Sequence, residues 1–450
     1  MLRKVLIANR GEIALRILRA LKDMGIASVA VHSTADAEAM HVRLADESVC
    51  IGPPPSAESY LNTSAILAAA EMTGADAIHP GVGFLSEKAE FARMVKEHGI
   101  TFIGPSPEHI DVMGDKIQAK GIAESLGIPC VPGYVGSLDS DLKRQQILKS
   151  IGTPLLIKAA HGGGGKGMQV VTNPATFLEQ LELAQSESKA NFGSDSVYVE
   201  RYLQTPRHIE FQVASDGKNA LVLGERDCSI QRRHQKIWEE APAPGIPRDA
   251  IARMQDVITK AMQEMGYLGL GTLEFLYENN QFYFIEMNTR IQVEHPITEM
   301  ITGIDLCRLQ IEIASGMLLS IHQDDLRFKG HAIECRINAE DPNTFAPSPG
   351  KIQAYLPPGG PHIRVDSGLY QGYSIPPYYD SLVAKLIAYG DTREDCLAHL
   401  KRALDEYVIA GPKTLIPLHK RLAACGAIQA GNYHIHWLED WLGKKSDAAA

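Results

Sequence analysis

Apolar and polar residues at the start of the chain alternate between strand-like runs and helical spacing. Residues 3–8 form a short apolar run with the length of a buried strand. Ile13, Ile17 and Leu21 then recur at helical spacing, and residues 27–32 form the next strand-like run. A strand, a helix and a strand in this order are typical of a βαβ unit. We therefore predict that the chain opens as a parallel α/β domain, which extends to about residue 105.

A second pattern occupies residues 133–203. Strand-like residues 154–159 lead into a run of glycines, which is followed by strand-like residues 168–171, a helix and a strand at residues 196–200. This order indicates a small α+β module. The remainder of the chain, from residue 204, mixes strands and helices and is predicted to form a third part.

The run of glycines is His161-Gly162-Gly163-Gly164-Gly165-Lys166-Gly167. It contains a G-x-G-x-x-G spacing, but a dinucleotide-binding fingerprint opens a helix, and a strand pattern follows here. It is not a Walker A loop, because no Ser or Thr follows Lys166. Backbone N–H groups of such a hairpin can close over phosphates, and Lys158 and Lys166 add positive charge. Because four consecutive glycines lose much entropy on ordering, we favour a phosphate-binding lid over a plain surface turn.

Two strand-like stretches further along the chain carry acidic residues at alternating positions. Glu274 lies in residues 269–277, and Glu286 and Asn288 share one face of residues 281–288. The two stretches are predicted to pair as an antiparallel hairpin, because only a few residues separate them.

The length of the hairpin loop decides whether the two acids meet. A two-residue turn would place Glu286 on the face opposite to Glu274. A three-residue loop, residues 278–280, would pair Glu274 with Phe284 and make Glu286 a diagonal neighbour on the same face. We predict the three-residue loop, with Asn280 in the left-handed conformation.

Two carboxylates and an amide oxygen on one face suit Mg²⁺, which takes few protein ligands and several substrate oxygens. We therefore interpret Glu274, Glu286 and Asn288 as ligands of Mg²⁺ or Mn²⁺ that bridges the phosphates of ATP. The alternative, a solvated polar sheet face, is the commoner arrangement in proteins. The continuation of the polar line argues against it.

This line continues as Arg290, Gln292 and Glu294, alternating with apolar residues. The nine residues from 286 to 294 would span about 26 Å in a straight strand, so the chain must bend if one site holds all of their polar side chains. Arg290 suits a small oxyanion such as bicarbonate, and Glu294 could remove its proton as a general base. Lys236, in a run of basic and amide residues, could neutralise a phosphate or a carboxylate.

Composition narrows the class of protein. The formal net charge of -10 argues against a general nucleic-acid or membrane-surface binder. No apolar run in the sequence approaches the roughly 20 residues that span a bilayer, and the first residues lack a signal-peptide core. The seven cysteines are scattered and form no C-x-x-C pair, so neither a disulfide framework nor a zinc site is expected. We expect a cytoplasmic protein that binds neither nucleic acid nor membranes.

The chain resembles the biotin carboxylases, a family of ATP-grasp enzymes, over about residues 2–445. The motifs that carry the resemblance are Ile7-Ala8-Asn9-Arg10-Gly11-Glu12-Ile13-Ala14, the glycine loop, Glu225-Arg226-Asp227-Cys228-Ser229, Arg232-Arg233-His234-Gln235-Lys236, Glu239-Glu240-Ala241-Pro242, Glu286-Met287-Asn288-Thr289-Arg290-Ile291-Gln292-Val293-Glu294-His295-Pro296 and Glu334-Cys335-Arg336-Ile337-Asn338-Ala339-Glu340-Asp341-Pro342.

The resemblance implies an ATP-grasp fold of mixed α/β and α+β class. Residues 1–115 would form a doubly wound parallel α/β domain. Linker helices and the glycine-loop lid would occupy residues 116–203, and residues 204–450 would form a mixed C-terminal domain. ATP would lie between the lid and the C-terminal domain.

The resemblance also implies the site residues. The implied ATP contacts are Lys116, Lys158, Gly163, Gly164, Gly165, Glu200, Leu203, His208, Gln231, His234 and Leu276, with Leu276 beneath the adenine ring. The implied bicarbonate site is Lys236, Arg290, Gln292, the backbone of Val293, and Glu294 as base. Arg336 would stabilise the enolate form of biotin, and the family is typically homodimeric, with Arg19 and Arg364 at interface positions.

The implied reaction uses ATP, bicarbonate and biotin as substrates. ATP would phosphorylate bicarbonate to carboxyphosphate, which would supply CO₂ to biotin. No methionine is followed by lysine, so the Ala-Met-Lys attachment motif is missing, and biotin is expected on a separate biotin carboxyl carrier protein. Carboxyltransferase subunits are the further expected partners, with acetyl-CoA carboxylase as the expected host complex.

The chain departs from the family pattern at Val82, where the family usually has tyrosine, near the expected biotin end of the site. His161 and Lys166 also differ from the commonest form of the lid, although lysine keeps the charge. Two other functions stay open at this point. One is a related ATP-grasp ligase or paralogous carboxylase subunit with a different acceptor. The other is a nucleotide-binding regulatory subunit with weakened catalysis.

Overall fold

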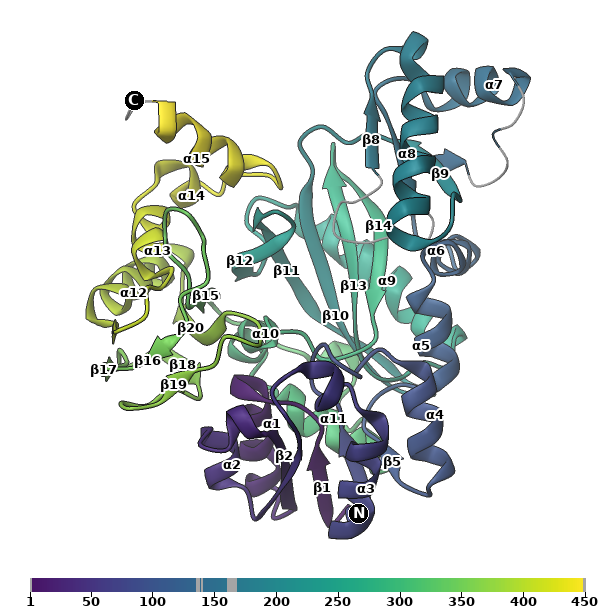
Figure 1. The fold of residues 1–450 in the computed structure, drawn as a ribbon. Coiled ribbons are helices and arrows are strands. Elements are labelled where there is room, and N and C mark those ends of the chain that lie inside the picture. The colour runs from purple at the N-terminus through teal and green to yellow at the C-terminus, as the bar shows by residue number, and fades with distance from the viewer. Residues whose placement is uncertain (1, 135–137, 139–140, 160–167, 448–450) are drawn as a thin grey trace.

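The computed structural model describes residues 2–134, 138, 141–159 and 168–447. The predicted glycine loop, with Gly163, Gly164 and Gly165, lies outside these residues. Within the described residues the chain forms three units, which are arranged around the three larger sheets (Figure 1). We propose that the unit boundaries fall near residues 115 and 203, in the segments that connect these sheets.

The N-terminal unit is a five-stranded parallel sheet with helices packed on it. Its strand order, β3-β2-β1-β4-β5, reverses direction at β1, which is the mark of a doubly wound fold, as predicted. The strands are β1 (Lys4–Ile7), β2 (Ala27–Ser33), β3 (Glu47–Gly52), β4 (Ala77–His79) and β5 (Thr101–Phe102). The helices are α1 (Gly11–Asp23), α2 (Met40–Leu44), α3 (Thr63–Thr73), α4 (Ala89–Glu97) and α5 (Pro107–Gly114), with short 3₁₀ turns at Thr34–Asp36 and Ser56–Glu58. A linker helix, α6 (Lys116–Ser125), follows and leads to the middle unit.

The middle unit is a four-stranded sheet with order β6-β9-β7-β8. Its strands are β6 (Gly133–Tyr134), β7 (Leu155–Ala159), β8 (Met168–Val171) and β9 (Val197–Arg201), and its helices are α7 (Asp141–Ile151) and α8 (Phe177–Phe192), with a 3₁₀ turn at Pro174–Thr176. The predicted order of two strands, a helix and a third strand is confirmed for the described residues 155–159 and 168–201. In Figure 1 this unit stands at the end of the molecule away from the N-terminal unit.

The third unit contains an antiparallel sheet of eight strands with order β14-β13-β10-β11-β12-β15-β20-β18. These strands are β10 (Arg207–Asp216), β11 (Ala220–Arg232), β12 (Gln235–Ala241), β13 (Leu268–Glu278), β14 (Gln281–Asn288), β15 (His331–Asn338), β18 (Ile363–Ser367) and β20 (Leu382–Gly390). Two small pairs flank it, β16 (Gly350–Lys351) with β19 (Ser374–Ile375), and β17 (Ala354–Leu356) with β21 (Val408–Ala410). The helices are α9 (Arg248–Glu264), α10 (His295–Thr302), α11 (Leu306–Ala314), α12 (Arg393–Glu406), α13 (Ile416–Ala423), α14 (Gly426–Gln429) and α15 (Trp437–Asp447), with a 3₁₀ turn at Gln323–Asp325.

The N-terminal unit packs directly on this sheet. The apolar stripe of α1, with Ile13, Ile17 and Leu21 buried, belongs to one core cluster with Leu270 of β13 and Ile291 of the segment after β14. Burial of apolar side chains is the main driving force for such docking. The packing fixes the N-terminal unit against the part of the sheet that carries the acidic hairpin.

All seven cysteines are free thiols. Among the helices of the described residues, none combines the length and the apolar character that a membrane span requires.

His419 of α13 is a buried histidine whose protonation opposes folding. Its Nε2 lies 2.8 Å from the carbonyl oxygen of Arg336, and its ring tilts over Trp238. Burial lowers the pKa of His419 to about 4, and the hydrogen bond to the carbonyl opposes this shift. The unfolded chain therefore takes up a proton at His419 below its ordinary pKa of about 6.5, whereas the folded chain does so only near pH 4. The stability that the neutral ring contributes is present above pH 6.5 and is lost as the pH falls toward 4.

We expect His419→Gln to lose less stability than the wild type when the pH is lowered from about 8 to about 5, by about 2 kcal/mol. The variant has no titratable ring, so its unfolded state gains no proton at this position. Urea unfolding curves of both proteins at the two pH values measure the difference. Equal losses in the two proteins would contradict the assignment.

Candidate active site

The turn between β13 and β14 differs from the prediction. Its two residues are Asn279 and Asn280, with left-handed φ of 53° and 62°. Such a pair of positive φ values is typical of a type I′ hairpin turn, which twists in the same sense as the strands. The predicted three-residue loop is therefore wrong, and the left-handed conformation of Asn280 is confirmed.

A β-bulge restores the pairing that the short turn would otherwise prevent. Phe275 pairs with Phe284, but Glu274 pairs with Glu286, so Ile285 is the extra residue on β14. The predicted pairing of Glu274 with Phe284 is wrong for this reason. The bulge turns Glu286 back to the face of Glu274, and the two residues are direct cross-strand partners.

The chain bends after β14 ends at Asn288, as the length of the polar line predicted. Residues 289–294 form neither helix nor strand, and α10 begins at His295. Within this segment Gln292 folds back on the hairpin, where its Nε2 donates to Glu274 Oε1 at 2.8 Å. The bend therefore gathers the polar line into one site.

Lys236 of β12 stands at the centre of this site. Its Nζ donates to Glu210 Oε2 at 2.6 Å, to Glu294 Oε1 at 2.7 Å and to Glu274 Oε1 at 2.9 Å. The three carboxylates come from β10, from the segment before α10 and from β13. Because charge-assisted hydrogen bonds are strong in a buried site, one lysine holds three separate chain segments together.

The charges of this group follow from its neighbours. Burial lowers the pKa of Lys236, but the carboxylates of Glu210, Glu274 and Glu294 hold it well above the ordinary 10.5. Burial raises the pKa of Glu294, but Lys236 and Arg336 hold it well below the ordinary 4.5. At neutral pH a charged lysine therefore faces an ionised Glu294.

Arg336 of β15 is the second cation on Glu294. Its Nη2 donates to Glu294 Oε2 at 2.9 Å, and its Nε donates to Glu239 Oε1 at 2.5 Å. Burial raises the pKa of Glu239 to about 7, with Arg336 acting against the rise and Glu294 adding to it. The guanidinium therefore bridges a firmly ionised carboxylate and one that is easily protonated.

Arg226 of β11 forms the floor of the site and is completely buried. Its guanidinium donates to Glu210 Oε1 at 2.5 Å and to Gln292 Oε1 at 2.6 Å, and also to Gln212, Thr272 and Thr298. A buried arginine is tolerated only when its donors are satisfied. It fixes the side chains of Glu210 and Gln292 from beneath.

Arg290 points to the N-terminal unit. Its Nε donates to Glu87 Oε2 at 2.8 Å and its Nη2 donates to Asn288 Oδ1 at 3.0 Å. The backbone N–H of Thr289 donates to Glu87 Oε1 at 3.1 Å. Glu87 therefore ties the segment after β14 to the loop between β4 and α4.

The start of that loop carries Val82. Asn9 Nδ2 donates to the carbonyl oxygens of Pro80 and Val82, both at 2.7 Å. Gly81 between them has φ of +65°, and a Cβ there would lie 2.8 Å from Asn9 Nδ2. Val82 is half-buried and packs against the core cluster that contains Ile291. Asn9, in the first of the quoted motifs, thus fixes the segment that holds Val82.

Several side chains could hold a metal ion. Among the described residues there are two groups of three residues whose ligand atoms lie within 4.8 Å of one another inside each group. The first group is His208, Glu210 and Glu274, and the second is Glu210, Cys228 and Glu294. Both groups contain Glu210, which Lys236 and Arg226 already neutralise. Glu274, Glu286 and Asn288 instead offer oxygen ligands only, and the Glu286 side chain is 37% exposed. These three fit Mg²⁺, which prefers oxygen ligands and leaves room for phosphate oxygens.

Three of the predicted phosphate and nucleotide residues lie near the acidic hairpin. His208 Nε2 lies 2.9 Å from Glu274 Oε2, and Gln231 Nε2 lies 2.8 Å from His208 Nδ1. Lys116 Nζ lies 3.5 Å from Glu286 Oε2. His234 does not join them, because it sits exposed in the turn between β11 and β12.

Lys158 and Glu200 form an ion pair in the middle unit. Lys158 Nζ donates to Glu200 Oε2 at 2.8 Å, and Lys120 Nζ donates to Glu200 Oε1 at 2.9 Å. Burial raises the pKa of Glu200, but the two lysines hold it below its ordinary value. Lys120 lies on α6, so its contact with Glu200 connects this helix to the sheet of the middle unit.

Leu203 and Leu276 meet in a small apolar cluster with Val131 and Tyr283. Leu203 follows β9 of the middle unit and Leu276 lies on β13, so the cluster joins the two units. An apolar patch beside charged groups is what an aromatic base with a phosphate tail requires.

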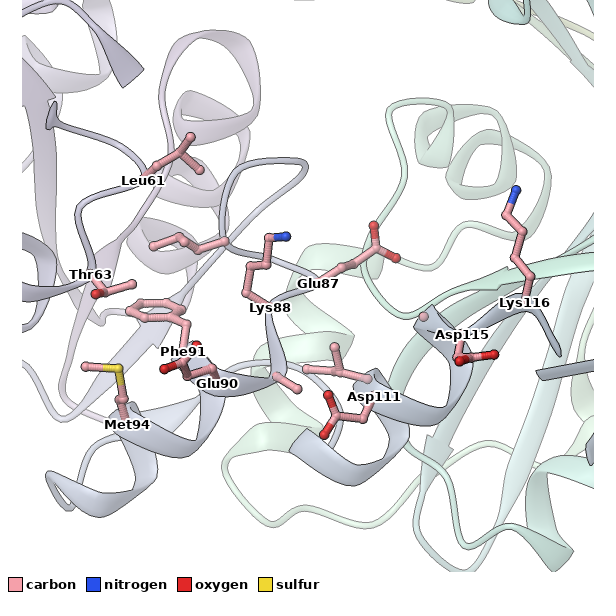
Figure 2. A pocket seen from close by; sticks show the side chains of 14 residues that line it. Leu61, Thr63, Glu87, Lys88, Glu90, Phe91, Met94, Asp111, Asp115 and Lys116 are labelled. Carbon is pink, nitrogen blue, oxygen red and sulfur yellow. The ribbon is translucent and has the colours of Figure 1, made fainter. Parts of the chain in front are cut away.

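A cavity of about 840 Å³ lies between the N-terminal unit and the start of α6. Figure 2 shows Glu87 and Lys116 on its wall, both extending to the same side, with Phe91 and Met94 further along α4. Through these two residues the cavity borders Arg290 and Glu286.

The sequence interpretation missed several residues of the site, chiefly Glu87, Lys120, Glu210, Arg226 and Glu239. One signal was available: on β10, His208, Glu210 and Gln212 alternate with apolar residues, as the acids of the hairpin do. No such signal marks Glu87 or Lys120, since both act through partners far away in the sequence.

Comparison with known proteins gives three family matches that together span most of the chain. Residues 1–110 match the biotin carboxylase N-terminal domain, residues 115–322 match the ATP-binding domain of the carbamoyl-phosphate synthase L chain, and residues 334–440 match the biotin carboxylase C-terminal domain.

Individual relatives agree over nearly the full length. The chain is 57% identical to biotin carboxylase of Haemophilus influenzae, over 98% of this chain and 99% of that protein. It is 46% identical, with a TM-score of 0.93, to the crystal structure of a biotin carboxylase–βγ-ATP complex from Campylobacter jejuni, over 98% of this chain and 99% of that one. A third match is the biotin carboxylase domain dimer of Hydrogenobacter thermophilus 2-oxoglutarate carboxylase with MgADP, ADP and bicarbonate, at 46% identity, a TM-score of 0.91 and 98% coverage of both chains.

Proposed function

The chain belongs to the biotin carboxylase family, and we propose from this premise how its residues carry out the ATP-dependent carboxylation of biotin. The enzyme is a ligase that uses ATP and bicarbonate and has biotin as its acceptor. The observation that carries the residue assignment is the Glu294 carboxylate, held between Lys236 and Arg336 at the edge of the acidic hairpin.

In the first half-reaction bicarbonate is phosphorylated. We assign its binding to Arg290, Gln292 and the backbone N–H of Val293, with Lys236 opposite. The first three groups lie in one segment, and together with Lys236 of β12 they can surround a small planar anion. Glu294 takes the proton of bicarbonate, the freed oxygen attacks the γ-phosphorus of ATP, and ADP leaves. The product is carboxyphosphate.

In the second half-reaction carboxyphosphate releases CO₂ and phosphate. The phosphate takes the proton from N1′ of biotin, and the enolate that forms attacks CO₂ to give carboxybiotin. Arg336 is assigned to the enolate oxygen. It is positioned for this role because Glu239 and Glu294 hold its guanidinium from two sides.

Glu294 can act as a base only if its cationic partners change. A carboxylate with so low a pKa holds a proton poorly. When the phosphates of ATP arrive, Lys236 has a new anionic partner, and its attraction on Glu294 falls. A weaker attraction from Lys236 would raise the pKa of Glu294, so we infer that nucleotide binding prepares this carboxylate to act as the base.

The remaining assignments concern the metal ion and the nucleotide. Glu274, Glu286 and Asn288 would hold Mg²⁺, which when bound neutralises the phosphates during phosphoryl transfer. Lys116, Lys158 and His208 would contact the phosphates, and Glu200, Leu203 and Leu276 would form the adenine side. Support comes from the nucleotide in the C. jejuni structure and the MgADP and bicarbonate in the H. thermophilus one.

We also propose the assembly around this chain. Biotin would arrive on a biotin carboxyl carrier protein and continue to carboxyltransferase subunits, with acetyl-CoA carboxylase as the host, in the cytoplasm. The H. thermophilus domain is a dimer, which supports a homodimer here. Of the two expected interface residues, Arg19 is exposed, whereas Arg364 is half-buried and pairs with Glu299 and Asp366 of its own chain.

Bicarbonate-dependent ADP release with Mg²⁺, measured with and without free biotin, tests the proposed function. We expect release to require bicarbonate and biotin to stimulate it. If bicarbonate adds nothing, the proposed chemistry is wrong. If bicarbonate supports release but biotin adds nothing, the acceptor is wrong. Val82→Tyr is the matched variant for the second outcome, because it restores the ring and hydroxyl usual in the family.

A further inference from the structure

Lys385 of β20 is a completely buried lysine that the reaction above does not use. Its Nζ donates to the carbonyl oxygen of Val293 at 2.9 Å and lies 3.0 Å from Glu12 Oε1. Asp366 Oδ2 is 3.9 Å away. A buried ion pair is weak evidence for stability, because apolar residues of similar volume often serve as well. The position of this ammonium therefore needs another explanation.

The carbonyl that Lys385 binds belongs to the segment between β14 and α10. No helix or strand fixes residues 289–294, yet they carry the side chains of Gln292 and Glu294. A hydrogen bond to the Val293 oxygen fixes the plane of the peptide that joins Val293 to Glu294, because that peptide is planar. The direction in which Glu294 leaves the backbone is then fixed as well.

Glu12 fixes the lysine in turn. It lies in the first turn of α1 and its side chain is buried. Because Glu12 belongs to the N-terminal unit, the contact joins that unit, the C-terminal strand β20 and the segment of Val293 at one ammonium group. Glu334 of β15 and Arg364 of β18 also act on the charge of Lys385, the carboxylate favouring it and the guanidinium opposing it. The charged lysine in turn helps burial to lower the pKa of His295 on α10, which leaves that ring neutral.

We propose that Lys385 is a positioning residue for the bicarbonate segment, which it holds through the Val293 carbonyl, with Glu12 as the anchor of the lysine. This inference rests on the proposed role of residues 290–294 in bicarbonate binding. It assigns Lys385 no contact with substrate.

The test is the KM for bicarbonate, compared with the KM for ATP, in the ADP-release assay. Lys385→Met keeps the chain length but removes the donor and the charge. We expect it to raise the KM for bicarbonate about tenfold, because a buried carbonyl loses its partner, and to leave the KM for ATP unchanged. A loss of folded enzyme alone would lower the maximal rate but would change neither the KM for bicarbonate nor the KM for ATP.

Two further variants complete the test. Glu12→Gln keeps an oxygen for the ammonium but removes the charge, so we expect a smaller rise in the KM for bicarbonate, about threefold. Glu225→Gln is the matched control, because Glu225 is a buried carboxyl on β11 that binds Arg248 and has no contact with the Lys385 group. We expect it to change neither constant.

The outcomes are distinct. A wild-type enzyme without bicarbonate-dependent ADP release contradicts the proposed function. A working wild type with an unchanged KM for bicarbonate in Lys385→Met overturns the positioning role, as does a parallel rise of both constants. If Lys385→Met does not fold, Glu12→Gln decides, and an unchanged KM for bicarbonate in that variant overturns the inference.

Discussion

Glu294→Gln is expected to lower bicarbonate-dependent ADP release by about 10²–10⁴-fold, the usual contribution of a general base. Glutamine keeps the size of the side chain, and its one oxygen can still accept a hydrogen bond from Lys236 or Arg336. It cannot take the proton of bicarbonate. Its NH₂ group would also face one of the two cations that now contact the carboxylate. Initial rates at saturating ATP, with bicarbonate varied, measure the loss.

Glu239→Gln is the matched control for this loss. Glu239 is also buried and also binds Arg336, but it lies on β12, outside the segment assigned to bicarbonate. We expect its substitution to reduce the rate much less, since its carboxyl is easily protonated at neutral pH and an amide resembles the protonated form. If Glu294→Gln keeps more than about a tenth of the activity, the base is another group.

The acidic hairpin shows how far sequence alone could lead. Alternation correctly placed Glu286 and Asn288 on one face, and the length of the polar line correctly required a bend. The predicted register was wrong because the structure has a two-residue turn and a bulge at Ile285 in place of a three-residue loop. Both arrangements put Glu286 on the face of Glu274. Residue spacing cannot distinguish these two solutions, since both shift the pairing by one position.

The contacts between site residues and their partners could not be predicted from the sequence for a different reason. Arg290 was predicted as an anion-binding residue, but its contact with Glu87 depends on how the N-terminal unit packs on the eight-stranded sheet. That packing follows from the apolar stripe of α1, which spacing predicts, and from its partners Leu270 and Ile291, which spacing does not. Helices and strands are local properties of a sequence, whereas this contact is a property of the assembled core.

Lys236→Met is the second substitution with a large expected effect. It removes the cation that Glu210, Glu274 and Glu294 share, and leaves three carboxylates facing one another in a buried site. We expect a loss of about 3–5 kcal/mol in the free energy of unfolding, because breaking a buried ion pair leaves uncompensated charge. We also expect a fall of about 10³-fold in ADP release, comparable to removing a donor that stabilises developing charge.

The double variant Glu210→Gln with Lys236→Met separates these two effects. It restores the net charge of the group, and the amide oxygen of glutamine can still accept from Arg226 Nε, which now donates to Glu210. We expect urea unfolding to show that much of the lost stability returns, while ADP release stays low, because no ammonium is left to meet the phosphates or bicarbonate.

Recovery of activity in the double variant would show that Lys236 serves only as a counter-ion. Wild-type stability in Lys236→Met alone would show that the carboxylates do not depend on it. The single variant Glu210→Gln, with its lysine intact, should retain most of the activity and so confirms that any loss in the double variant comes from position 236.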